Sequence, residues 1–328
     1  MSVETNVLEI EGLALHLPRT ARPVLNGVDL TVGAAEIVAL VGESGSGKSL
    51  TLRAALRLLP RQATVRGSIR IAGEDVLTMT PTRLRDLRAG TASMVFQDPR
   101  AAINPLRRIG DFLTESTRTN HAVADELATA RARELLAAVG LTDRVLLQYP
   151  HELSGGMLQR IVIASALMSD PRLLLCDEPT TALDVTTQAE IVALLARIRR
   201  RFGTGVLFVT HDLGLAAAIS DRVFVMYAGR IVEHGPADSL FGAPRHPYTA
   251  ALLASTPRLE APSARLAAIS GQPPDLHTEL TGCPFAARCP YVIDRCRAER
   301  PEPEEGVACH RAGELVLSAL LEGDRCDG

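Results

Sequence analysis

Eight consecutive residues have the types and the spacing of a loop that binds phosphate groups. They are Gly42, Glu43, Ser44, Gly45, Ser46, Gly47, Lys48 and Ser49. The glycines allow backbone N–H groups to curl around the β- and γ-phosphates of a nucleotide, and the start of a following helix adds a favourable dipole. Lys48 brings a positive charge to the phosphates, and the hydroxyl of Ser49 is a ligand for Mg²⁺. The alternative is a glycine-rich turn without a ligand, and the strand and helix expected on either side of the loop argue against it.

Lys48 is also the only lysine among the 35 lysine and arginine residues of the chain. A genome that favours arginine accounts for the excess of arginine, but it does not explain why lysine is kept here. A compact ammonium reaches into a phosphate cradle in which a planar guanidinium fits badly. The exception therefore supports phosphate binding at Lys48.

Asp177 and Glu178 form an acidic pair at the end of the apolar run 173–176. An acidic residue at the end of a strand beside a phosphate loop is placed to hold Mg²⁺ through water, and the next carboxylate can orient an attacking water molecule. Two adjacent acids are more often a solvated strand end. Their position after four apolar residues, downstream of the phosphate loop, favours the magnesium site.

Ser154, Gly155 and Gly156 come directly before a stretch with helical spacing. A hydroxyl and free backbone N–H groups at the start of a helix form a second place where an anion can bind. Serine at this position is also a common helix cap. These three residues alone do not separate the two interpretations.

The elements that must position these residues alternate between apolar runs and helical patterns, which is typical of βαβ units and a mainly parallel sheet. The expected buried strands are 36–41, 172–176 and 205–209, and the clearest helices are 50–59, 126–139 and 157–168. The segment of about 99–165 is expected to be an inserted helical subdomain. After about residue 245, proline, cysteine and arginine become frequent. The predicted domains are therefore 1–245 and 246–328.

Composition limits the classes of function. The 328 residues are 46% hydrophobic, enough for a full core. The formal net charge is −3 and no basic block stands out, so no nucleic-acid partner is expected. The first residues lack the basic and apolar parts of a signal peptide, and no apolar stretch approaches the roughly 20 residues that span a bilayer. Any link to a membrane is expected to come through other subunits.

Three further motifs complete an ordered set that resembles the ABC ATPase family. They are Gln97 in Val-Phe-Gln-Asp-Pro, Asp184 in Thr-Ala-Leu-Asp, and His211 in Val-Thr-His-Asp. The resemblance covers about residues 7–240. It implies an α/β P-loop NTPase fold, with a RecA-like core, an antiparallel β-subdomain and the inserted helical subdomain. It also implies that two such chains pack head to tail, with each ATP between the phosphate loop of one chain and residues 153–156 of the other.

The resemblance implies a role for each motif residue. Glu178 would polarise the attacking water, His211 would sense the γ-phosphate, and Lys48 would neutralise developing charge. The residues expected to hold Mg²⁺ are Ser49, Gln97 and Asp177. The residues expected to complete the ATP site across the dimer are Ser154, Gly155 and Gly156, and Asp184 is a further expected nucleotide-binding residue. Gln97 and the residues after it, to about Ile109, are expected to form the groove for a membrane subunit.

The chain departs from the family where an aromatic residue usually stacks on adenine. His16 and Leu17 occupy the corresponding positions. Stacking of a base on an aromatic side chain is worth roughly 1–3 kcal/mol in other nucleotide sites. Either His16 takes over the stacking or the base is held weakly.

Within the family, the chain is similar to the oligopeptide and dipeptide importer branch, through Ala-Ile-Asn-Pro at 102–105 and His-Pro-Tyr-Thr at 246–249. This implies an ATPase at the cytoplasmic face of the inner or plasma membrane. The implied partners are a second ATPase subunit, either identical or a paralogue, two transmembrane permease subunits and an extracytoplasmic solute-binding protein. Importers of nickel or other small solutes share the His-Pro-Tyr-Thr element. A soluble ABC ATPase outside transport is the third possibility.

Four of the six cysteines cluster near the C-terminus at Cys283, Cys289, Cys296 and Cys309. Disulfides are improbable in a cytosolic ATPase, and four thiolates in an irregular segment suggest a metal site. The two candidates are a [4Fe–4S] cluster and a tetrahedral zinc, and the resemblance to the importer branch places the cluster first. Four unliganded structural thiols are the alternative.

Overall fold

The structure is a computed structural model that describes residues 6–18, 20–121, 123–181, 183–255 and 269–317. Two parts of the predicted C-terminal domain, 256–268 and 318–328, lie outside the described residues, and Cys326 is in the second of them. No helix within the described ranges is long and apolar enough to cross a membrane.

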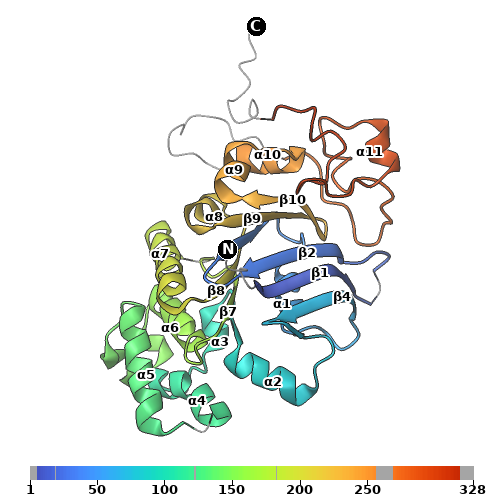
Figure 1. The fold of residues 1–328 in the computed structure, drawn as a ribbon. Helices are drawn as coiled ribbons and strands as arrows, with labels where there is room; N and C mark the ends of the chain where they lie inside the picture. The colour runs from blue at the N-terminus through green and yellow to red at the C-terminus, as the bar shows by residue number, and fades with distance from the viewer. Residues whose placement is uncertain (1–5, 19, 122, 182, 256–268, 318–328) are drawn as a thin grey trace, which may run out of the picture.

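The strands form two sheets (Figure 1). They are β1 (Asn6–His16), β2 (Leu25–Gly33), β3 (Ile37–Val41), β4 (Thr64–Ile71), β5 (Glu74–Asp75), β6 (Ala92–Val95), β7 (Leu173–Asp177), β8 (Gly205–Thr210), β9 (Arg222–Tyr227) and β10 (Arg230–Pro236). The first sheet is antiparallel in the order β2-β1-β4-β5. The second has the order β10-β9-β3-β8-β7-β6, and all its neighbours are parallel except β10 and β9. The predicted α/β class with a mainly parallel sheet and an additional antiparallel sheet is confirmed.

Every residue of β3, β7 and β8 is buried. Strands of a parallel sheet that is covered on both faces are apolar throughout, which is why these three were recognisable from the sequence. Because they are parallel neighbours, their carboxyl ends meet at one edge of the sheet. That edge receives the loop 42–49, the acidic pair after β7 and His211 after β8.

The helices pack on both faces of the larger sheet and below it (Figure 1). They are α1 (Lys48–Ala55), α2 (Pro81–Gly90), α3 (Pro99–Ala102), α4 (Ile109–His121), α5 (Asp125–Ala138), α6 (Gly155–Ala166), α7 (Val185–Phe202), α8 (Leu213–Ile219), α9 (Ala237–Gly242), α10 (Pro247–Ala254) and α11 (Asp294–Ala298), with 3₁₀ turns η1 (Asp143–Leu147) and η2 (Pro150–Glu152). Four helices, α3 to α6, lie between β6 and β7 in the chain, so the predicted helical character of this segment is confirmed. Its independence as a subdomain remains a prediction.

Helix α1 is shorter at its end than the predicted helix 50–59. Arg57 has a φ of 50°, which places it in the left-handed region. The N–H of Leu58 then donates to the carbonyl of Arg53 at 2.7 Å, and the N–H of Arg57 donates to Ala54 at 2.9 Å. This is the Schellman pattern that ends many helices, usually with glycine at the left-handed position. Arginine at this position does not indicate a helix end, so the sequence did not predict that α1 ends at Ala55.

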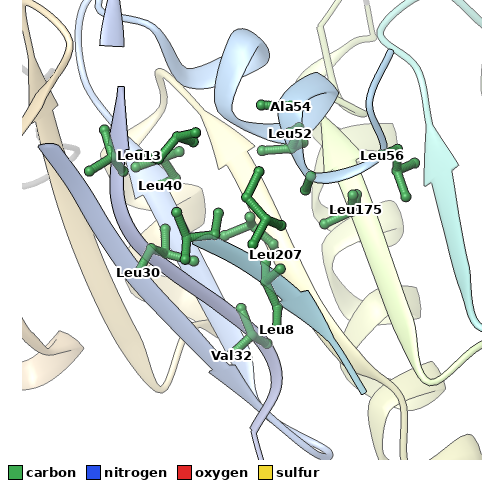
Figure 2. Close-up of a cluster of buried hydrophobic side chains, with 14 of the residues drawn as sticks. Leu8, Leu13, Leu30, Val32, Leu40, Leu52, Ala54, Leu56, Leu175 and Leu207 are labelled. Carbon is green, nitrogen blue, oxygen red and sulfur yellow. The ribbon is translucent and has the colours of Figure 1, made fainter. Parts of the chain in front are cut away.

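The main core lies between the two sheets, with α1 inside it. Figure 2 shows side chains from both sheets and from the region of α1 gathered in one cluster, including Leu8, Leu30, Leu52, Leu175 and Leu207. All five are at most 1% exposed. This packing fixes the start of α1, and therefore the loop before it, relative to the ends of β3 and β7.

The described C-terminal residues pack beside β9 and β10, on the side of the larger sheet away from α4 and α5 (Figure 1). Tyr248 of α10 and Phe285 share a buried cluster with Val41 of β3 and Tyr227 of β9. The predicted boundary near residue 245 remains a prediction, and the two sides of it share this core.

Candidate nucleotide site

The loop 42–49 joins β3 to α1, as predicted for a phosphate-binding loop. Gly42 has a φ of 151° and Gly47 a φ of 111°, values that other residues rarely adopt. A Cβ atom on Gly42 would lie 2.2 Å from the backbone oxygen of Met226. Glycine is therefore needed for close approach between the loop and β9 as well as for the backbone turn.

Lys48 is the first residue of α1 and its side chain turns back over the loop. Its Nζ donates to the carbonyl oxygens of Gly42 at 2.8 Å and Glu43 at 3.0 Å. Burial lowers the pKa of Lys48, while the nearby carboxylates of Glu178 and Asp177 act in the opposite direction. The side chain is thus held at the loop in a place that favours an additional anionic partner.

Ser46 contributes a second sign that the loop is built for a ligand. Its Oγ is buried and has no hydrogen-bond partner within the described part of the chain. Buried hydroxyls normally have a partner. Together with the backbone conformation of the glycines, this fits a loop that binds phosphate.

Ser49 and Asp177 meet as expected for a magnesium site. The Oγ of Ser49 donates to Oδ1 of Asp177 at 2.6 Å, across the junction of α1 and β7. Asp177 is 3% exposed, and burial raises the pKa of its carboxyl group. A hydroxyl and a carboxylate at this spacing are oxygen ligands of the kind that Mg²⁺ takes.

Glu178 is the centre of a group of polar side chains. Its Oε2 accepts a hydrogen bond from Thr181 Oγ1 at 2.9 Å and lies 3.2 Å from His211 Nδ1. Gln97 Nε2 is 3.5 Å from the same oxygen, at the long limit of a hydrogen bond. Parallel pairing of β7 and β8 explains why Glu178 and His211 are neighbours although 33 positions separate them.

The structure therefore brings Gln97 to Glu178, while its predicted contact with magnesium stays a prediction. Thr181 was missed by the sequence reasoning. The available signal was a hydroxyl three residues after the acidic pair, at the start of the turn that follows it. Glu178 itself has a φ of 47°, an uncommon conformation for a non-glycine residue that tends to occur at functional sites.

Ser154 and Asp184 lie at the starts of α6 and α7. Ser154 Oγ accepts from the N–H of Met157 at 3.3 Å, and Asp184 accepts from the N–H of Thr187 at 3.0 Å. Both are helix caps, which confirms that alternative for Ser154 without excluding an additional contact with an anion. Gly156 is required at the crossing of the two helices, because its Cβ would lie 2.7 Å from Thr187 Cγ2. In the described structure these residues hydrogen-bond within their own helices and not to loop 42–49.

His16 and Leu17 differ in their surroundings. His16 ends β1 opposite Thr64 of β4 and is partly exposed, whereas Leu17 packs against the main core. A side chain that packs against the core is poorly placed to stack on a base. Whether His16 stacks on adenine or the base is held weakly stays a prediction.

Cys283, Cys289, Cys296 and Cys309 line one small pocket. The N–H of Cys283 donates to the carbonyl of Cys296 at 2.8 Å, which holds two parts of the segment together. Burial, together with the other three thiols of the pocket, raises the pKa of Cys283 to about 11. Among the described residues, however, no three histidine, cysteine or acidic side chains are spaced to hold a metal ion.

Comparison with known proteins gives two family matches. Residues 25–181 match the family described as ABC transporter, and residues 232–296 match the one described as oligopeptide/dipeptide transporter, C-terminal region. A solved dimeric structure of the ATP-binding cassette MJ0796, bound to ADP and Pi in a post-hydrolysis state, has a TM-score of 0.62 and 27% identity. That likeness covers 70% of this chain and 98% of the other.

Two curated relatives cover nearly all of the chain. "Oligopeptide transport ATP-binding protein OppD" of Mycobacterium tuberculosis is 46% identical over 97% of this chain, but only 53% of that protein is covered. "Probable peptide ABC transporter ATP-binding protein y4tR" of Sinorhizobium fredii is 42% identical over 94% of this chain and 96% of that protein. The chain thus spans about half the length of the mycobacterial relative and nearly the full length of the rhizobial one.

Proposed function

Since the chain belongs to the ABC transporter ATP-binding family, we propose that it binds and hydrolyses ATP to energise an importer of dipeptides or oligopeptides. The observation that carries the proposal is the arrangement at the edge of the larger sheet. There the phosphate loop, the Ser49–Asp177 pair and the group around Glu178 lie at the ends of adjacent strands. A nucleotide triphosphate with Mg²⁺ is the ligand that this combination fits.

In the proposed mechanism Lys48 and the loop amides bind the phosphates. Ser49, Asp177 and Gln97 would hold Mg²⁺, which would supply positive charge to offset the charge that develops on the γ-phosphate. Glu178 orients and polarises the attacking water, and His211 reads the γ-phosphate from the end of β8. Thr181 and Gln97 hold the Glu178 carboxylate in place for this step.

We propose that two such chains pair head to tail, because a complete site needs groups that this chain holds away from its own loop. Ser154, Gly155, Gly156 and Asp184 would contact the ATP on the loop of the other subunit. The dimeric form of the similar MJ0796 cassette supports this arrangement. The second subunit is either identical or a paralogue.

The proposed assembly adds two transmembrane permease subunits and an extracytoplasmic solute-binding protein, with this chain peripheral at the cytoplasmic face of the membrane. The match of residues 232–296 and the names of the relatives support peptides as cargo. The test is ATP-dependent uptake of labelled peptides by vesicles that contain the assembled complex. Uptake of nickel and not of peptides would replace the proposed cargo, and a chain that does not copurify with membrane subunits would contradict the transport function.

We also propose that residues 246–328 form a C-terminal extension in which the four cysteines bind a [4Fe–4S] cluster. The convergence of all four thiols on one pocket supports this, although their spacing in the structure does not itself form a metal site. Binding would deprotonate the thiols and add order to a segment with little regular structure.

Protein purified without oxygen is expected to be brown and to carry iron and sulfide at about four each per chain. One zinc per colourless chain would replace the cluster by the tetrahedral alternative. A metal-free protein whose four-serine variant folds and assembles normally would leave four structural thiols.

A further inference from the structure

Glu43, the second residue of the phosphate loop, is held by a residue 245 positions later in the chain. Arg288 Nη1 donates to Oε2 of Glu43 at 2.7 Å, and Nη2 donates to Oε1 at 2.9 Å. Two parallel hydrogen bonds between a guanidinium and a carboxylate fix the geometry as well as the charge. The Arg288 side chain is only 4% exposed, so water competes little for this pair.

Arg288 is itself held in place by several groups. Its Nε donates to the carbonyl of Ser270 at 3.0 Å, and Nη1 donates to the hydroxyl of Tyr227 at 3.2 Å. The guanidinium also lies over the rings of Tyr227 and Phe285. The hydrogen bonds to Glu43 raise the pKa of Arg288. The guanidinium is therefore a rigid charged anchor.

Tyr248, from the His-Pro-Tyr-Thr element, holds the backbone of Glu43. Its hydroxyl accepts a hydrogen bond from the N–H of Glu43 at 2.9 Å. Tyr248 is fully buried, and its ring packs against Tyr227 and Phe285 with centroids 4.6 and 5.4 Å apart. The side chain and the N–H of Glu43 are thus both fixed by residues that lie after position 245.

The contact continues to the catalytic lysine, because the carbonyl of Glu43 accepts from Lys48 Nζ at 3.0 Å. Loop 42–49 contains three glycines with positive φ, and a glycine-rich loop loses much conformational freedom when it orders around a ligand. Groups that hold such a loop in its binding conformation before the ligand arrives reduce that cost.

We propose that Arg288 and Tyr248 are positioning residues for ATP binding, which act through Glu43 to preorganise the phosphate loop and Lys48. The segment around the cysteine pocket thereby becomes part of the nucleotide site's support, since Arg288 directly precedes Cys289. This inference rests on the proposed binding of ATP by residues 42–49. The chemistry that it concerns is recognition of the triphosphate, not the cleavage step.

The test is an equilibrium titration of the purified full chain with a fluorescent ATP analogue and Mg²⁺. Arg288→Gln removes the fork and is expected to weaken binding about tenfold, the lower range for partners that orient binding groups. Arg288→Lys keeps the charge but cannot form the two parallel hydrogen bonds. Its affinity for the analogue is expected to lie between those of Arg288→Gln and the wild type. Tyr248→Phe removes only the oxygen that accepts from Glu43 and is expected to weaken binding by a smaller factor. Arg295→Gln is the matched control, because Arg295 lies in the same segment but pairs with exposed Glu299.

A double-mutant cycle separates positioning from general loss of stability. If Arg288 acts through Glu43, the double variant Glu43→Gln/Arg288→Gln binds no more weakly than Arg288→Gln alone. Full additivity of the two effects, or wild-type affinity in folded Arg288→Gln, would overturn the inference. If Arg288→Gln does not fold, Tyr248→Phe decides, and wild-type affinity in that variant would reject the role. Lys48→Ala tests separately whether residues 42–49 bind ATP. Equal affinity of this variant and the wild type would contradict the proposed ATP site itself.

Discussion

Glu178 combines two features that rarely occur together in a residue with only a structural role. Its backbone has a φ of 47°, and its carboxylate collects contacts from Thr181, His211 and Gln97. A left-handed conformation at a residue with a Cβ atom costs of order 1–3 kcal/mol. The N–H of Glu178, which donates to Val209 of β8 at 3.1 Å, helps to hold that conformation. In this conformation the carboxylate lies among Thr181, His211 and Gln97.

Replacing Glu178 by glutamine is expected to preserve ATP binding and to reduce turnover by about 100-fold or more, the range for loss of a general base. The amide keeps the shape of the side chain but loses the charge that polarises water. ATPase activity of the assembled complex and size-exclusion chromatography with MgATP measure the two effects, and a trapped dimer is expected. Exposed Glu126→Gln is the control. Wild-type turnover in Glu178→Gln would refute the assignment.

Gly42→Ala is expected to destabilise the chain by at least about 3 kcal/mol, whereas Gly45→Ala is expected to cost about 1 kcal/mol. Both glycines have positive φ, but a Cβ at Gly42 meets a backbone oxygen at 2.2 Å and one at Gly45 meets nothing within 4 Å. Chemical unfolding without nucleotide measures the difference. Equal costs would show that backbone conformation, and not close approach to β9, decides the need for glycine.

At the scale of elements, α10 is joined to the core by the two residues that precede it. The N–H groups of Arg245 and His246 donate to the buried carboxylate of Glu233 on β10, at 2.7 and 3.0 Å. His246 caps α10 by accepting from the N–H of Tyr248 at 3.0 Å. The His-Pro-Tyr-Thr element is therefore a short helix start that is anchored from both sides, and it delivers the Tyr248 hydroxyl to the phosphate loop.

This anchoring predicts a loss of stability in mild acid. Burial lowers the pKa of His246 from 6.5 to about 3. The unfolded chain therefore binds a proton at this residue below pH 6.5 while the folded chain does not, and stability falls as pH decreases from about 6.5 towards 3. Between pH 7 and pH 5 this residue alone is expected to remove about 2 kcal/mol.

His246→Asn keeps a capping group without a titrating ring, so the free energy of unfolding of this variant is expected to depend less on pH. Denaturant titrations at pH 7 and pH 5 provide the measurement. Glu233, whose pKa is raised by burial, acts in the opposite direction but is present in both proteins. Identical pH dependence in the variant and the wild type would contradict the buried neutral histidine.

On the scale of the whole molecule, the nucleotide site lies between two differently built regions. Helices α4 and α5 lie on one side of the larger sheet, and α10 with the cysteine-bearing segment lies on the other (Figure 1). Gln97 leads into α3 on the first side, and Glu43 contacts Arg288 on the second. Nucleotide binding at the site can therefore change contacts in both regions.

The groove expected after Gln97 has one large exposed hydrophobic side chain, Leu106, at 85% exposure, whereas Ile103 is 3% exposed. A photo-crosslinker at Leu106 or Arg100 is expected to capture a permease subunit in the assembled complex. The same probe at Ile103 is expected to capture nothing, because Ile103 is buried in the chain's own core. Crosslinks only from the exposed face of α7 would reject this surface.

Features that depend on the local order of residues were predictable before the fold was known. Buried strands such as β3 and β7 appear as continuous apolar runs, and the residues that follow them must meet at one edge because the strands are parallel. This is why the phosphate loop, Asp177 and Glu178 were predictable together. The helix start at Ser154 was recognisable for a similar reason, since capping acts within a few residues.

Contacts between residues far apart in the chain, or without a local sequence signal, became known from the fold. Arg288 was one arginine among many until the fold placed it on Glu43, and the contact between Gln97 and Glu178 was not part of the sequence prediction. The left-handed conformations of Arg57 and Glu178 carry no glycine signal, because surrounding contacts and not intrinsic preference select them. Packing between side chains that are distant in the sequence stabilises these conformations. A short stretch of sequence does not show that packing, so the conformations could not be predicted from it.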